Sequence, residues 1–137
     1  MLKKYKEARI DYTKAIELLP EKAPTYRRWR GICNYNLNFA QEALDDFKTF
    51  LSKDANDSYI LVMAGHSLYV LEDYQQAIEY YNKAINVKSD YTEAYYWRGY
   101  SYFNLGKKAE AKRDVDKAIS LDPANETYLK FRRDNFK

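Results

Sequence analysis

Hydrophobic residues along this chain follow the spacing of helices, not that of strands. No stretch keeps the alternation of apolar and polar positions typical of a strand, and steps of three and four residues instead align side chains along helical faces. Asp90 followed by Glu93 predicts a capping box at one helix start, and Pro24 suits the first turn of another. We therefore expect helices at about 4–19, 24–37, 40–53, 58–71, 74–87, 91–105, 108–121 and 126–136.

Three glycines recur at one interval inside these predicted helices. Gly31, Gly65 and Gly99 are 34 residues apart. The same interval links a second set of small residues, Ala43, Ala77 and Ala111. A glycine inside a helix costs about 1 kcal/mol relative to alanine, so we expect a second helix to pack closely against each one. A period of this length indicates stacked helical hairpins.

The clearest unit of this period runs from Thr92 to Asn125. It resembles a tetratricopeptide repeat, with Tyr95 at the large aromatic position, Gly99 at the small position and Pro123 as terminator. Two preceding units keep the same register, and the family resemblance covers nearly the whole chain. The resemblance implies an all-α fold, a right-handed α-solenoid of stacked antiparallel helix pairs.

This resemblance also implies how the chain is divided. We expect a single domain over 1–137, with three full repeats, a preceding half repeat and a C-terminal capping helix. The parts are 1–22, 24–57, 58–91, 92–125 and 126–137. Because residues 5–20 match only the second helix of a repeat, we expect the chain to be a piece of a longer array. Tyr128, Phe131 and Phe136 on the last helix could support stacking of repeat ends.

Candidate chemistry for catalysis is sparse. One histidine and one cysteine cannot assemble a His/Cys metal cluster, and the dispersed glycines form no phosphate-binding loop. The acidic pairs 45–46 and 72–73 are expected on solvated helix exteriors or turns. Cys33, beside Gly31, is expected to be a small buried residue. We therefore expect no enzyme activity, no catalytic residues, no metal and no cofactor.

Charge and hydropathy bear on the partners and the cellular location of the protein. The formal net charge is +3, with basic ends and an acidic middle, a pattern that could either coat solvated faces or set the register of a partner. No apolar run is long enough for a membrane span, and residues 1–12 lack the apolar core of a signal peptide. Together with the single cysteine, these features favour a cytoplasmic location and no membrane partner.

In the resembling family, the first helices of the repeats line a concave groove. The positions expected there are Thr25, Arg28, Ile32, Tyr35, Asn36, Tyr59, Val62, His66, Tyr69, Glu93, Tyr96, Tyr100, Phe103 and Asn104. This surface is aromatic, and aromatic residues concentrate at binding hot spots. We expect it to bind an extended or helical peptide, although the same aromatics could instead pack between repeats. His66 could contact a ligand or fill space beside Tyr69, whereas Trp29 and Trp97 are expected to pack at edges or between repeats.

Three kinds of partner follow from this interpretation. The leading prediction is a scaffold that binds a protein or peptide. Chaperone C-terminal tails are disfavoured, because the family's lysine, asparagine and arginine clamp for a carboxylate has no counterpart here. The alternatives are self-assembly into homo-oligomers through repeat ends, and nucleic-acid binding through basic clusters at residues 3–9 and 107–113, which the small net charge disfavours.

Overall fold

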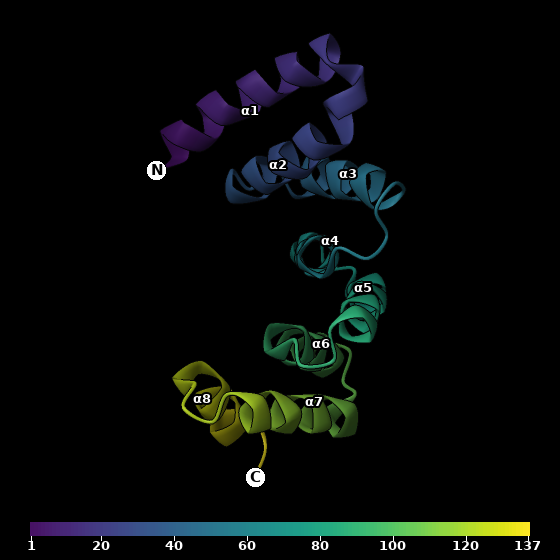
Figure 1. The fold of residues 1–137 in the computed structure, drawn as a ribbon. Coiled ribbons are helices and arrows are strands. Elements are labelled where there is room, and N and C mark those ends of the chain that lie inside the picture. Colours follow the sequence, from purple (N-terminus) through teal and green to yellow (C-terminus); the bar gives the residue numbers. More distant parts are fainter.

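The computed structural model describes residues 1–137 as an arc of stacked helices without strands. Figure 1 shows α2, α4 and α8 toward the open left side of the arc, with α3 and α5 away from it. The elements are α1 (Leu2–Leu18), the short 3₁₀ helix η1 (Pro20–Lys22), α2 (Ala23–Asn36), α3 (Ala40–Leu51), α4 (Ser58–Val70), α5 (Tyr74–Val87), α6 (Thr92–Asn104), α7 (Lys108–Leu121) and α8 (Glu126–Asn135). The predicted all-α solenoid is confirmed, and Pro24 lies in the first turn of α2 as expected.

Each helical glycine lies where its helix meets the next one. A Cβ atom added at Gly31 would come within 2.6 Å of the Phe47 ring, and one at Gly65 within 2.5 Å of the Tyr81 ring. At Gly99 the added atom would meet Asp114 at 3.0 Å. The prediction that these glycines permit close helix packing is therefore confirmed.

The core is continuous in the middle of the arc and thinner toward its ends. A cluster of 14 buried residues joins α3, α4 and α5 to the start of α6. Every residue of α4 from Ile60 to Leu68 is buried, so this helix lies at the centre of the core. Two smaller clusters of three buried residues each hold α6, α7 and α8 together.

Aspartate and asparagine side chains cap the starts of α4, α5 and α8. Asp57 accepts a hydrogen bond from the Ile60 backbone N–H at the start of α4, and Asp73 does the same at α5. The predicted capping box is wrong, because Tyr91 is the N-cap residue of α6 and no side chain caps that end. Glu93 is instead bonded to His66.

The last helix turns its aromatic residues inward. Tyr128 and Phe136 are buried, and Phe131 stacks on Tyr100 with 4.8 Å between ring centroids. The outward positions of α8 are polar, among them the ion pair of Lys130 with Asp134. The expectation that these aromatics form an apolar stacking face is therefore wrong, since they close the end of the core.

The helices of this structure also show no candidate for a membrane span, because none combines sufficient length with sufficient hydrophobicity.

Candidate functional site

The inner face of the arc is built by α2, α4 and α6, the helices that carry the predicted groove residues. Exposure divides these residues into three groups. Thr25, Tyr59, Glu93 and Asn104 are exposed. Arg28, Ile32, Tyr35, Asn36, Tyr69, Tyr100 and Phe103 are half-buried. Val62, His66 and Tyr96 are 1%, 8% and 6% exposed, so they lie largely beneath the inner face, and of the three only Tyr96 reaches a surface recess.

An aromatic cluster forms the middle of this face. The Tyr69 ring lies 5.2 Å from Tyr74, 5.2 Å from Trp97 and 5.6 Å from Tyr100, in each case edge to face. Such edge-to-face pairs are stabilising beyond the area they bury. Burial raises the pKa of the Tyr69 hydroxyl, so this group stays protonated as a donor. The structure thus brings Tyr69 and Tyr100 together and confirms that Trp97 packs between repeats.

Amide side chains accompany the aromatic cluster. The Asn104 side-chain N–H₂ donates to the Tyr100 carbonyl at 2.8 Å and to the Tyr69 hydroxyl at 3.3 Å. Asn36 makes the equivalent bond to the Ile32 carbonyl at 2.8 Å. Each side-chain carbonyl oxygen remains free to accept a hydrogen bond from a ligand.

His66 joins three helices beneath this surface. Its Nε2 lies 2.9 Å from Glu93 Oε1, and its Nδ1 lies 2.8 Å from the Tyr81 hydroxyl. Because a carboxylate only accepts, Nε2–H donates to Glu93, and in the tautomer that carries its single proton on Nε2, Nδ1 accepts from the Tyr81 O–H. The Trp97 ring packs on the imidazole with centroids 5.2 Å apart. His66 is therefore a connection between α4, α5 and α6.

Glu93 carries a pH dependence that follows from this connection. The hydrogen bond from His66 holds the pKa of the Glu93 carboxyl below its ordinary value of 4.5. A carboxyl with a depressed folded-state pKa stabilises the fold fully above its unfolded pKa and loses that contribution as the pH falls through the folded value. In urea unfolding between about pH 5.5 and about pH 3.5, we expect the wild type to lose more stability than Glu93→Gln. Equal losses in both proteins would contradict the assignment.

Arg28 is not free to act as a bare cation on the inner face. Its Nε donates to Asp57 Oδ2 at 3.0 Å, which neutralises the charge locally. The guanidinium also lies 5.7 Å from the Tyr59 ring centroid and 5.0 Å from that of Trp29. Arg28 therefore orders the start of α4 and the neighbouring aromatic rings.

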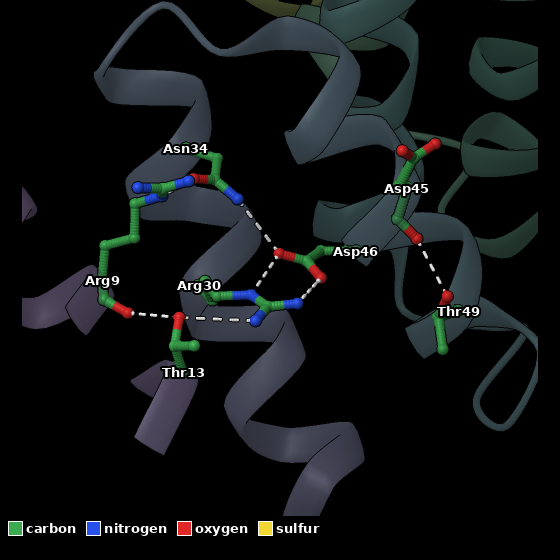
Figure 2. Close-up of polar contacts among 7 residues, drawn as sticks. All are labelled: Arg9, Thr13, Arg30, Asn34, Asp45, Asp46 and Thr49. Atoms are coloured by element: carbon green, nitrogen blue, oxygen red, sulfur yellow. Dashed lines mark hydrogen bonds and ion pairs between the residues drawn. The ribbon is translucent and has the colours of Figure 1, made fainter. Parts of the chain in front are cut away.

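A buried polar network lies between α1, α2 and α3, and sequence reasoning missed it. Figure 2 shows Asp46 facing Arg30 and Asn34, while Asp45 points away. Arg30 donates from Nη2 to Asp46 Oδ1 at 2.7 Å and from Nε to Asp46 Oδ2 at 2.9 Å. Asn34 donates to Asp46 and accepts from Arg9 Nε at 2.6 Å. The expectation that Asp46 is solvated is wrong, because this network holds it at 4% exposure.

The same arrangement returns two repeats later. Arg98 binds Asp114 with 2.6 Å and 2.7 Å contacts and donates to Asn82 of the preceding helix pair. Arg98 follows Arg30 by twice the interval that separates the glycines, as Asp114 follows Asp46. The recurrence of an arginine and an aspartate at twice the glycine interval is the sequence pattern that could have predicted these networks. The networks tie adjacent repeats together and lie away from the aromatic cluster.

Concavities in the surface are small and open. One of about 190 Å³ is lined by Tyr35, Asn36 and Val70, and another of about 260 Å³ by Tyr96, Tyr100 and Phe131. A larger one of about 450 Å³ lies on the other side, between α3 and α5. No three His, Cys, Asp or Glu side chains converge to hold a metal ion. The inner face offers shallow recesses for side chains and no deep cavity for a small molecule.

Comparison with known protein families finds repeats in the C-terminal half. One family model described as "TPR repeat" matches residues 65–106, and one described as "Tetratricopeptide repeat" matches residues 92–125. Protein bimA of Emericella nidulans is 30% identical over 88 residues, which cover 64% of this chain and 11% of that protein. The chain spans 7% to 20% of the length of the curated relatives that it matches.

Solved structures share the fold at low sequence identity. The crystal structure of MamA superposes with a TM-score of 0.83 and 23% identity, covering 87% of this chain and 69% of that chain. The first TPR of Spaghetti (RPAP3), bound to an HSP90 peptide, gives a TM-score of 0.78 and 23% identity over 81% of this chain and 88% of that chain. These likenesses show a common helical architecture.

Proposed function

This chain belongs to the tetratricopeptide-repeat family, and from that premise we propose that it is a non-catalytic scaffold that binds a peptide or partner segment along the inner face of α2, α4 and α6. We propose repeats at 24–57, 58–91 and 92–125, preceded by a half repeat and followed by the capping helix α8. The first TPR of RPAP3 is a fold relative that is bound to a peptide, which supports a binding role for this architecture.

The observation that carries the proposal is the row of half-buried aromatics on successive inner helices. Tyr35, Tyr69, Tyr100 and Phe103 keep part of each ring open to solvent, and Asn36 and Asn104 lie beside them. Rigid aromatic rings next to amide acceptors can bury apolar side chains and fix the register of a peptide backbone. The inner face carries no free cluster of cations, so acidic chaperone tails remain disfavoured as ligands.

Peptide selection from a random phage-displayed library tests this function directly. For the selected peptide, we expect the double variant Tyr69→Ala, Tyr100→Ala to bind at least about 30-fold more weakly, equivalent to about 2 kcal/mol. The matched control Tyr80→Ala, Tyr95→Ala removes two tyrosines outside the groove and should bind normally. Circular dichroism verifies that both variants remain helical.

Two outcomes would contradict the groove. If the wild type selected no peptide, the proposed binding function would be contradicted. If both double variants lost binding equally, the aromatic cluster would not be the binding surface.

Nucleic acid is a poorer candidate ligand for this protein. Lys112 and Arg132 near the C-terminus both bind Asp116, which reduces the free positive charge there.

A further inference from the structure

The recess of about 450 Å³ between α3 and α5 lies on the side of the arc away from the inner face (Figure 1). Leu61 of α4 forms its base and is only 2% exposed. Ala55, from the loop after α3, and Tyr80 and Lys83, from α5, stand around that base. We call this place the Leu61 recess. Because it is open to solvent above an apolar base, it can receive a side chain from outside the protein.

The corresponding place one repeat later shows which side chain such a site accommodates. The counterparts of the recess residues lie 34 positions further on: Tyr95 for Leu61, Ser89 for Ala55 and Lys117 for Lys83. The half-buried Tyr95 donates its hydroxyl to the Ser89 carbonyl at 2.8 Å, and Lys117 Nζ lies 5.8 Å from the Tyr95 ring centroid. No surface recess is lined by any of these three residues. The ring of Tyr95 therefore closes the place that stays open at Leu61.

Leucine at position 61 leaves unused the features that hold a tyrosine in the later repeat. Its side chain is shorter and has no hydroxyl to donate. The Ala55 carbonyl accepts no hydrogen bond from another backbone group. Lys83 forms no ion pair, and its Nζ lies 4.8 Å from the Tyr80 ring centroid. The recess thus keeps an acceptor and a cation at the two positions where the later repeat uses them to hold a phenol.

We propose that the Leu61 recess binds a tyrosine side chain of a partner protein. The ring of that tyrosine takes the place that Tyr95 has in the later repeat, its hydroxyl donates to the Ala55 carbonyl, and Lys83 packs against the ring. Tyrosine suits this role because it combines a large rigid ring with one polar tip, and it is common among the residues that anchor protein interfaces. The site is distinct from the inner face, since no residue of α2 or α6 lines it.

The one neighbour that differs between the two places favours the same occupant. Tyr80 stands where the later repeat has Asp114, and Asp114 is bound to Arg98. Tyr80 is half-buried and gives the Leu61 recess an aromatic wall, which favours an aromatic side chain over an aliphatic one. Lys83 disfavours a lysine or arginine in the same place, because like charges would meet. These neighbours together select a neutral aromatic side chain with a hydrogen-bond donor.

Titration of the full chain with a short peptide, followed by NMR at individual amide groups, tests the proposal. The probe is acetyl-Gly-Tyr-Gly-amide, and the peptide with phenylalanine in place of tyrosine is the comparison. We expect the tyrosine peptide to shift the amide signals of Ala55 and Asn86, which both line the recess. The phenylalanine peptide should bind at least about threefold more weakly, because it lacks the hydroxyl that donates to the Ala55 carbonyl.

Two substitutions exchange the open and the closed place. Leu61→Tyr fills the recess with a ring of the protein itself and should weaken binding of the tyrosine peptide at least about tenfold. Tyr95→Leu opens the corresponding place without adding volume to the core, and the peptide should then also shift the signals of Ser89 and Lys117. The matched control Leu105→Tyr adds a tyrosine at a position that is 39% exposed and outside the recess, and it should bind like the wild type. Circular dichroism verifies that the variants remain helical.

Several results would overturn the proposal. The first is an absence of shifts around the recess up to the solubility limit of the tyrosine peptide. The second is undiminished binding by Leu61→Tyr, because the tyrosine would then bind elsewhere, and shifts confined to Tyr69 and Tyr100 would place it on the inner face. Free p-cresol, which has the same ring and hydroxyl, separates a side chain from a small phenol. Binding of p-cresol without binding of the peptide would show a site for small phenols and would contradict a partner's side chain as the occupant.

Discussion

Replacing Tyr81 by alanine is expected to lower the free energy of unfolding by about 4 kcal/mol, as measured by urea denaturation followed by circular dichroism. The Tyr81 ring is fully buried and fills the space against Gly65. Its removal leaves a cavity between α4 and α5 that the surrounding helices cannot close without moving apart. The change also removes the hydroxyl that His66 Nδ1 contacts at 2.8 Å.

A conservative variant separates these two causes. Tyr81→Phe keeps the ring and removes only the hydroxyl, so we expect a loss of about 1–2 kcal/mol for the unpaired His66 nitrogen. If Tyr81→Ala were no worse than Tyr81→Phe, the packing of the ring against Gly65 would not be a main source of stability. A loss confined to Tyr81→Ala would instead show that the hydrogen bond to His66 contributes little.

Removing the carboxylate of Asp46 is expected to cost about 3 kcal/mol, at the low end for a broken buried ion pair. Arg30 would lose both of its contacts to Asp46 in a site where its side chain is only 23% exposed. Asn34 would lose its acceptor as well. The adjacent variant Asp45→Ala changes an exposed carboxylate and should alter the free energy of unfolding by less than about 0.5 kcal/mol.

The pair can also be replaced as a unit. Arg30→Met combined with Asp46→Leu removes both charges, and we expect this double variant to be more stable than Asp46→Ala alone, because no buried charge is left without a partner. Similar urea midpoints for Asp45→Ala and Asp46→Ala would contradict the network as a stabilising feature. So would a double variant that is less stable than Asp46→Ala.

The fold could be predicted from the sequence because its main signals are local and repeated. Glycines at one interval, small residues at the same interval and the absence of strand alternation all favour stacked helix pairs. The left-handed turns show the same period, since Asn38, Glu72 and Gly106 have φ values of 66°, 62° and 76°. Glycine adopts such a conformation without strain and asparagine tolerates it, so Gly106 and Asn38 are the local signs of this turn and Glu72 gives none.

Side-chain partners were harder to predict because they depend on distances between helices. Asp45 and Asp46 are adjacent and chemically identical, yet one is exposed and the other buried. The facing Arg30 and Asn34 of α2 distinguish them. Glu93 was assigned to the inner face, but neither its bond to His66 nor the absence of a cap at α6 could be read from the local pattern.

The inner face shows a similar division between pattern and packing. The sequence assigned both Tyr69 and Tyr100 to the inner face, and the structure has their rings 5.6 Å apart. The same spacing assigned Val62 and Tyr96 to the inner surface, where neighbouring helices cover them. Periodicity gives the direction of a side chain from its helix axis, whereas burial depends on how closely the next helix approaches.

The uneven core described above also sets an order of assembly. Helices in this arc contact only their neighbours or next neighbours along the chain, so folding requires little closure of long loops and should be fast. Nucleation is favoured where α3, α4 and α5 share the 14-residue cluster, and structure then propagates outward. Helix α1 has no fully buried residue and lies outside this cluster, so we expect it to dock late and to open at a lower free energy than α4.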